Sequence, residues 1–118
     1  MSLDVEKRGK VHVLTPKTDL SGGEETREIE QAVEEIIAQG TPYIVIDLGR
    51  VSYVNSTGLG SLVAAHTKCR NRQGWLRLAQ IGKRIKNLFL ITKLAFVFET
   101  FDSVDEALID SDSSEQGS

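Results

Sequence analysis

The chain has 118 residues, 40% of them hydrophobic, and a formal net charge of −3, which fits one compact domain and leaves no room for a second. Its Lys and Arg residues form no continuous basic stripe, which argues against a nucleic-acid-binding protein. No apolar segment reaches the ~20 residues of a membrane-spanning helix, and the N-terminus has no signal-peptide pattern, so a cytoplasmic protein is expected.

The N-terminal region has the pattern of a short antiparallel hairpin. Apolar and polar residues alternate in Leu3–Lys7 and again in Val11–Thr15, on either side of Arg8-Gly9-Lys10. Such alternation is typical of strands, and the central glycine favours a tight turn. Pro16, which has no backbone N–H, is expected to end the pairing.

The next segment has the pattern of an amphipathic helix. It opens with Glu24 and Glu25, whose charge suits the positive end of a helix dipole, and it stops at Gly40. Its apolar residues recur at helical spacing: Ile29, Val33, Ile36 and Ile37. The other face is acidic and polar and is expected to face solvent.

A buried strand followed by a helix is predicted over the centre of the chain. Tyr43–Leu48 is a nearly unbroken apolar run, as expected of a strand covered on both faces. A helical pattern then runs from Ser56 to Gly74, where a left-handed glycine is expected to end the helix. The only cysteine, Cys69, lies in this helix. An internal disulfide is therefore impossible, and Cys69 is expected to pack as a small apolar residue.

Small polar residues, Asn55-Ser56-Thr57, form the junction between that strand and that helix. Asn, Ser and Thr accept hydrogen bonds from the free amides of a first helical turn, so one of the three is expected to cap the helix. The same amides and the helix dipole favour an anion, which makes Ser56 a chemically reasonable phosphorylation site. From this local pattern alone, the simpler interpretation is that Ser56 only caps the helix.

Two further strands and two further helices are predicted after Gly74. The strands are Trp75–Ala79, which alternates, and Ala95–Phe101, which is largely apolar. Lys83–Ile91 has a helical apolar stripe, and Ser103 heads a short C-terminal helix. The tight basic group of the chain is interpreted as the solvated side of a helix rather than as an anion site; it consists of Lys83, Arg84 and Lys86.

Strands that alternate with helices predict an α/β fold. Parallel strands joined by right-handed helical crossovers place helices over the sheet, and the N-terminal hairpin adds an antiparallel pair. We therefore expect a mixed, mostly parallel sheet of about four to five strands covered by about four helices. The domain is expected to span residues 1–110, and the polar segment 111–118 to be a disordered tail.

Enzymatic roles find little support in the sequence. A nucleophilic serine needs a base and an orienting group, and the residues around Ser56 are not a Gly-x-Ser-x-Gly elbow. His66 lies about 15 Å farther along the helix, and His12 belongs to the hairpin. Asp47 ends a central strand, as the phosphoacceptor of receiver domains does, but it lacks the acidic neighbours that hold magnesium. We therefore expect Asp47 to accept backbone hydrogen bonds, and we predict no catalytic residue, metal or cofactor.

The segment Val51–Gly60, VSYVNSTGLG, resembles the signature of the anti-sigma-factor antagonist, or STAS domain, family. That signature is a buried strand followed by an aromatic and aliphatic pair, Asp or Asn, Ser, Ser or Thr, Gly, an aliphatic residue and Gly. Residues 53–60 match it in order. The resemblance continues through Gly74–Leu78, Ile91–Leu94, Val97-Phe98 and Phe101–Leu108, and so covers most of the chain from about Val11 to Leu108.

The resemblance implies a phosphorylation-controlled partner switch in bacterial transcription. The unmodified domain would bind an anti-sigma factor that is also a serine/threonine kinase, and would thereby release a sigma factor. Phosphorylation of Ser56 would block this binding, and a serine phosphatase would reset the domain. Thr57 is the secondary phosphorylation candidate. The implied partner-binding residues are Asp19, Asn55, Ser56, Thr57, Gly58 and Leu59.

The chain departs from the family pattern at two places. Many phosphorylated members have Asp where this chain has Asn55, and Ser21–Gly23 lengthen the loop that follows Asp19. The alternative function is a non-phosphorylated STAS interaction module, either a signalling scaffold or an accessory subunit of a transporter.

Two readings stay open for the small and apolar residues of the junction. Gly58 and Gly60 either leave the turn open to the backbone of a partner or allow close packing of the helix on the sheet. Leu59 is either a half-exposed contact for the partner or a core residue.

Overall fold

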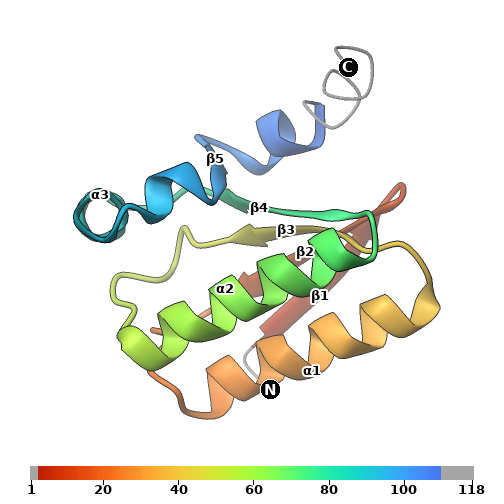
Figure 1. Ribbon diagram of the computed structural model, residues 1–118, viewed down its shortest axis with the longest axis horizontal. Helices are drawn as coiled ribbons and strands as arrows, with labels where there is room; N and C mark the ends of the chain where they lie inside the picture. The colour runs from red at the N-terminus through yellow and green to blue at the C-terminus, as the bar shows by residue number, and fades with distance from the viewer. Residues whose placement is uncertain (1–2, 110–118) are drawn as a thin grey trace.

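The computed structural model describes residues 3–109, which form a five-stranded sheet in the order β1-β2-β3-β4-β5 (Figure 1). The strands are β1 (Leu3–Arg8), β2 (Val11–Pro16), β3 (Tyr43–Asp47), β4 (Trp75–Ala79) and β5 (Glu99–Phe101). The helices are α1 (Glu24–Gln39), α2 (Ser56–Asn71), α3 (Lys83–Thr92), the 3-10 turn η1 (Leu94–Phe96) and a helical segment at 104–109. The predicted mixed α/β fold is therefore confirmed.

The first two strands form the predicted antiparallel hairpin, and the other neighbouring strands pair in parallel. Gly9 takes a left-handed conformation at the turn, with φ of +64°, which a residue without a side chain adopts at little cost. Pro16 is the last paired residue of β2 and lies opposite Leu3. The hairpin thus ends one residue later than expected.

The sheet separates two apolar layers of unequal size. Ile44, Val45 and Ile46 of β3 have no exposed surface, as predicted for a strand covered on both faces. Ile44 and Ile46 belong to the main core, which α1, α2 and α3 cover. Val45 faces the smaller core on the other side, where the segment 104–109 packs (Figure 1).

Helix α1 has the predicted bounds and the predicted buried stripe, and Gly40 terminates it. Helix α2 ends earlier than predicted, at Asn71, and the left-handed residue is Gln73 rather than Gly74. A Cβ atom on Gly74 would lie 1.8 Å from the carbonyl oxygen of Pro42. The glycine is therefore required by a close backbone approach and not by its φ angle.

The predicted strand Ala95–Phe101 is wrong in its first half. Lys93 takes a left-handed conformation, with φ of +64°, at the end of α3, and the chain then makes the turn η1. Only Glu99–Phe101 pairs with β4. Of the apolar residues before it, Phe98 is buried against Phe89 and His66, whereas Phe96 is 89% exposed.

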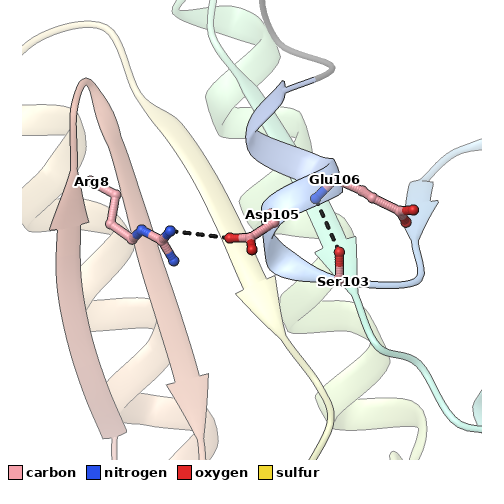
Figure 2. A network of polar contacts seen from close by, with 4 residues as sticks. All are labelled: Arg8, Ser103, Asp105 and Glu106. Atoms are coloured by element: carbon pink, nitrogen blue, oxygen red, sulfur yellow. Dashed lines mark hydrogen bonds and ion pairs between the residues drawn. The ribbon is translucent and has the colours of Figure 1, made fainter.

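The helical segment 104–109 packs on the sheet through the smaller core, and an ion pair and a local cap add polar contacts. Figure 2 shows the ion pair between Arg8 and Asp105, 3.1 Å long, and Ser103 Oγ accepting from the Glu106 amide at 3.1 Å. Ser103 thus caps this segment, as expected. The predicted disordered tail, residues 111–118, lies outside the described residues.

None of the helices within residues 3–109 combines the length and the hydropathy of a membrane span.

Candidate partner-binding site

The candidate residues lie together at the carboxyl edge of the sheet, although they come from two distant parts of the sequence. Asp19 follows β2, and residues 55–59 follow β3 and begin α2. An isolated parallel bridge between Leu20 and Val54 joins the two segments. Because β2 and β3 are parallel neighbours, their following loops meet at the same edge, where α/β proteins present their sites.

Asn55 is the residue that caps α2. Its side-chain oxygen accepts from the Gly58 amide at 2.9 Å, and its backbone N–H donates to the Leu20 carbonyl at 3.0 Å. Its side-chain Nδ2 donates to the Ser21 carbonyl at 3.0 Å. The expectation that one of the three small polar residues caps the helix is confirmed. The amide group of Asn55 also makes a bond that a carboxylate in its place would not.

Ser56 does not cap the helix, so the simpler interpretation of this serine is wrong. It is the first residue of α2 and is exposed. Within residues 3–109 its Oγ has no hydrogen-bond partner, and the amides of Ser56 and Thr57 have no acceptor. The hydroxyl therefore lies at the positive end of the helix dipole beside free N–H donors.

Thr57 also does not cap α2. It is exposed, and its methyl group would lie 2.8 Å from a Cβ placed on Gly22. The loop before α1 therefore packs closely on the first turn of α2. Gly22 also has a φ of +89°, which favours glycine at this position. Thr57 thus has a packing role in the first turn of α2, and its phosphorylation stays a prediction.

Asp19 organises the loop that leads into α2. Its Oδ1 accepts from the Ser52 amide at 3.0 Å, the Ser52 hydroxyl at 3.2 Å and the Tyr53 amide at 3.2 Å. These bonds tie the segment after β2 to the segment after β3. The pattern of the sequence did not reveal them, because no local signal links residues that are 33 or 34 positions apart. Direct contact between Asp19 and a partner stays a prediction.

The junction glycines have different surroundings. A Cβ on Gly58 would lie 2.2 Å from the Leu20 carbonyl oxygen, whereas a Cβ on Gly60 would meet nothing within 4 Å. Close packing therefore requires the first glycine, and nothing in the described chain requires the second. Leu59 is half-buried and packs against the main core.

Three titratable residues outside the site, His66, Cys69 and Asp47, are held by packing or by hydrogen bonds within the fold. His66 packs edge-on against Phe98, with ring centroids 5.3 Å apart. The pKa of His66 is lowered mainly by burial and, to a smaller extent, by the positive charge of Arg70. Burial raises the pKa of the Cys69 thiol to about 11, as expected of a packed apolar residue. Asp47 Oδ1 accepts from the Gly49 amide and from Gln80 Nε2, both at 2.9 Å, which confirms its predicted role.

Comparison with protein families gives one match over nearly the whole chain. The model of the STAS domain matches residues 2–107. An anti-sigma-B factor antagonist of Listeria monocytogenes is 36% identical over 98 residues, which cover 82% of this chain and 76% of the relative.

Solved structures share the fold. A Thermotoga maritima protein has a TM-score of 0.83 at 20% identity, with 92% of each chain covered. The anti-sigma factor antagonist SpoIIAA has TM-scores of 0.73 in its unphosphorylated form and 0.74 in its phosphorylated form, at 20% and 17% identity. Each match covers 92% of this chain. The matches cover 96% of the unphosphorylated SpoIIAA chain and 98% of the phosphorylated one.

Proposed function

The chain belongs to the STAS domain family of the anti-sigma factor antagonists, and on this premise we propose that it is a phosphorylation-controlled partner switch. The members of this family are not enzymes, and membership in the family implies that the partner is an anti-sigma factor. In the proposed cycle the unmodified chain binds an anti-sigma factor with serine kinase activity and so releases a sigma factor. Ser56 Oγ then attacks the γ-phosphorus of ATP, ADP leaves, and a base of the kinase takes the hydroxyl proton. A serine phosphatase hydrolyses the phosphoserine.

The observation that carries the proposal is that Asn55, and not Ser56, caps α2. Asn55 satisfies the cap, and the exposed Ser56 hydroxyl is left without a partner in the described chain. A kinase that modifies Ser56 therefore removes no hydrogen bond from the fold. The free amides of the first turn are available to the new phosphate oxygens.

The charge of the phosphate opposes association more strongly than it opposes folding. A phosphoserine carries about −1.5 to −2 charges at neutral pH. In the unbound chain, solvent and the helix N-terminus stabilise this charge. Burial against a partner without a matching cation costs about 2 to 5 kcal/mol of binding free energy, which corresponds to tens to thousands of fold in affinity.

The comparisons and the local charge are compatible with this switch. SpoIIAA, which shares the fold, is known in both a phosphorylated and an unphosphorylated form. In this chain the residue before the serine is the neutral Asn55 and not a carboxylate. Its neutrality reduces the repulsion that a phosphate on Ser56 would meet.

The first test identifies the modified residue. The chain is incubated with ATP and the serine-kinase anti-sigma factor from the genome that encodes it, and phosphate is located by mass spectrometry in the wild type, Ser56→Ala and Thr57→Ala. We expect phosphate uptake by the wild type and by Thr57→Ala, and none by Ser56→Ala. Phosphate on another residue with Ser56 unmodified would contradict the assignment. No phosphorylation, with binding that is insensitive to Ser56→Asp, would favour the alternative interaction module.

A further inference from the structure

A shallow apolar hollow lies next to the candidate site. It has a volume of about 250 Å³ and lies between α3 and the segment that leads into α2. Tyr53 and Val54 form one wall, and Leu88, Ile91 and the stem of Arg84 form the other. Val54 and Ser56 are separated only by Asn55, so the hollow and the serine belong to one continuous surface.

The walls of this hollow expose large apolar side chains. Tyr53 is 45% exposed and Ile91 is 80% exposed. Exposed apolar surface that borders a concavity is typical of a protein-binding site.

A positively charged residue, Arg84, lines the hollow, whereas Lys83 and Lys86 do not line it, and Lys86 lies on the opposite side of α3. Lys83, Arg84 and Lys86 are exposed, and none of them forms an ion pair within residues 3–109. The first turn of α3 contains no acidic residue, and Gly82 provides no side-chain cap. Cations at this end of a helix oppose its dipole. The fold therefore offers no stabilising partner for these three charges.

We propose that the hollow binds a segment of the anti-sigma factor in which a bulky apolar side chain lies beside a carboxylate. The apolar side chain enters between Tyr53 and Ile91, and the carboxylate pairs with Arg84. This proposal rests on the proposed function, because it assigns the partner of the Ser56 surface a second point of contact. The charge of Arg84 selects the partner and accelerates the encounter, while the apolar contact contributes burial.

A second copy of this chain fits the hollow less well than such a segment. The outer face of α1 supplies carboxylates, but it has no large exposed apolar side chain to fill the hollow. The large apolar side chains exposed elsewhere include Leu90 and Phe96, which belong to α3 and η1 and thus lie beside the same basic residues. Two such surfaces would bring like charges together.

The electrostatic half of the proposal is tested by two matched variants. Arg84→Glu, the rim variant, reverses the charge that borders the hollow, and Arg70→Glu, the control variant, makes the same charge change at an exposed position at the far end of α2. Affinity for the anti-sigma factor is measured by titration calorimetry at low and high salt. We expect the rim variant to lose about tenfold or more at low salt and much less at high salt, and the control variant to lose less than about threefold.

The apolar half is tested by a second matched pair. Ile91→Ala removes a wall of the hollow, and Leu90→Ala removes the neighbouring exposed side chain that does not line it. We expect a loss of about fivefold or more for Ile91→Ala and little change for Leu90→Ala. Thermal unfolding of all four variants checks that the fold is retained.

The outcomes separate this inference from the partner switch. If Ser56→Asp weakens binding but the rim variant and its control behave alike, the docking site is wrong and the switch stands. If Ile91→Ala and Leu90→Ala behave alike, the apolar anchor is wrong. If the unmodified wild type does not bind the anti-sigma factor, both proposals fail.

Discussion

At the scale of single residues, α2 contains a matched pair of glycines with opposite requirements. Gly58 has the Leu20 carbonyl oxygen within 2.2 Å of the place where a Cβ would be, and Gly60 has open space. We predict that Gly58→Ala lowers the free energy of unfolding by about 1 to 3 kcal/mol, because α2 must move away from Leu20. Gly60→Ala should raise it by about 0.5 to 1 kcal/mol, because alanine is the better helix former.

Urea unfolding of the two variants and the wild type measures both effects. Each substitution adds one methyl group to the first two turns of the same helix, so helix propensity changes equally and only the surroundings differ. Equal shifts in stability would show that the close approach of Leu20 does not constrain α2.

Local sequence patterns predicted the position of the helix cap but not the residue that provides it. The cluster Asn55-Ser56-Thr57 correctly placed a cap at the start of the helix, but the pattern favoured Ser56 over Asn55. The backbone N–H of Asn55 bonds to Leu20 and its side chain bonds to Ser21, and both partners lie far away in the sequence. The role of Asp19 in holding Ser52 and Tyr53 was not predictable for the same reason.

At the scale of secondary-structure elements, two arginines hold the segment 104–109 on the sheet. Arg77 of β4 is buried, donates to the Ala107 carbonyl at 3.0 Å and to Glu99 at 3.0 Å, and lies 4.0 Å from the Trp75 ring centroid. Arg8 of the hairpin pairs with Asp105 in solvent (Figure 2). The two contacts have similar lengths but very different surroundings.

We predict that Arg77→Ala lowers the free energy of unfolding by about 3 kcal/mol, because it leaves a buried carbonyl without its donor and empties a packed site. Arg8→Ala should cost at most about 0.5 kcal/mol, as is usual for exposed ion pairs. Guanidinium unfolding monitored by Trp75 fluorescence measures both. A similar cost for the two variants would contradict the assignment of Arg77 as the main attachment of this segment.

The elements that the sequence predicts well are those whose pattern is local. The hairpin, α1, β3 and β4 follow from alternation, apolar stripes and turn residues, and their bounds agree with the structure to within a residue or so. The segment 95–98 does not follow this rule. Its apolar residues suggested a strand, but Phe98 is used to fill the core beside Phe89, and the left-handed Lys93 redirects the chain.

At the scale of the whole molecule, the Ser56 side chain lies outside both apolar layers, although Leu59 of the same helical turn packs against the main core. The main core lies between the sheet and α1, α2 and α3, and the smaller one lies under the segment 104–109. Ser56 is at the edge of the sheet, where neither layer depends on its hydroxyl. A charge added there should therefore alter what the molecule binds and leave its fold intact.

The most direct measurement compares the unmodified chain with the chain phosphorylated at Ser56. Affinity for the anti-sigma factor is measured by titration calorimetry, and thermal unfolding of both forms is followed by circular dichroism. We predict that phosphorylation weakens binding by about thirtyfold or more and shifts the melting temperature by no more than about 4 °C, the equivalent of roughly 1 kcal/mol or less. Unchanged affinity, or a phosphorylated chain that is unfolded, would contradict the account.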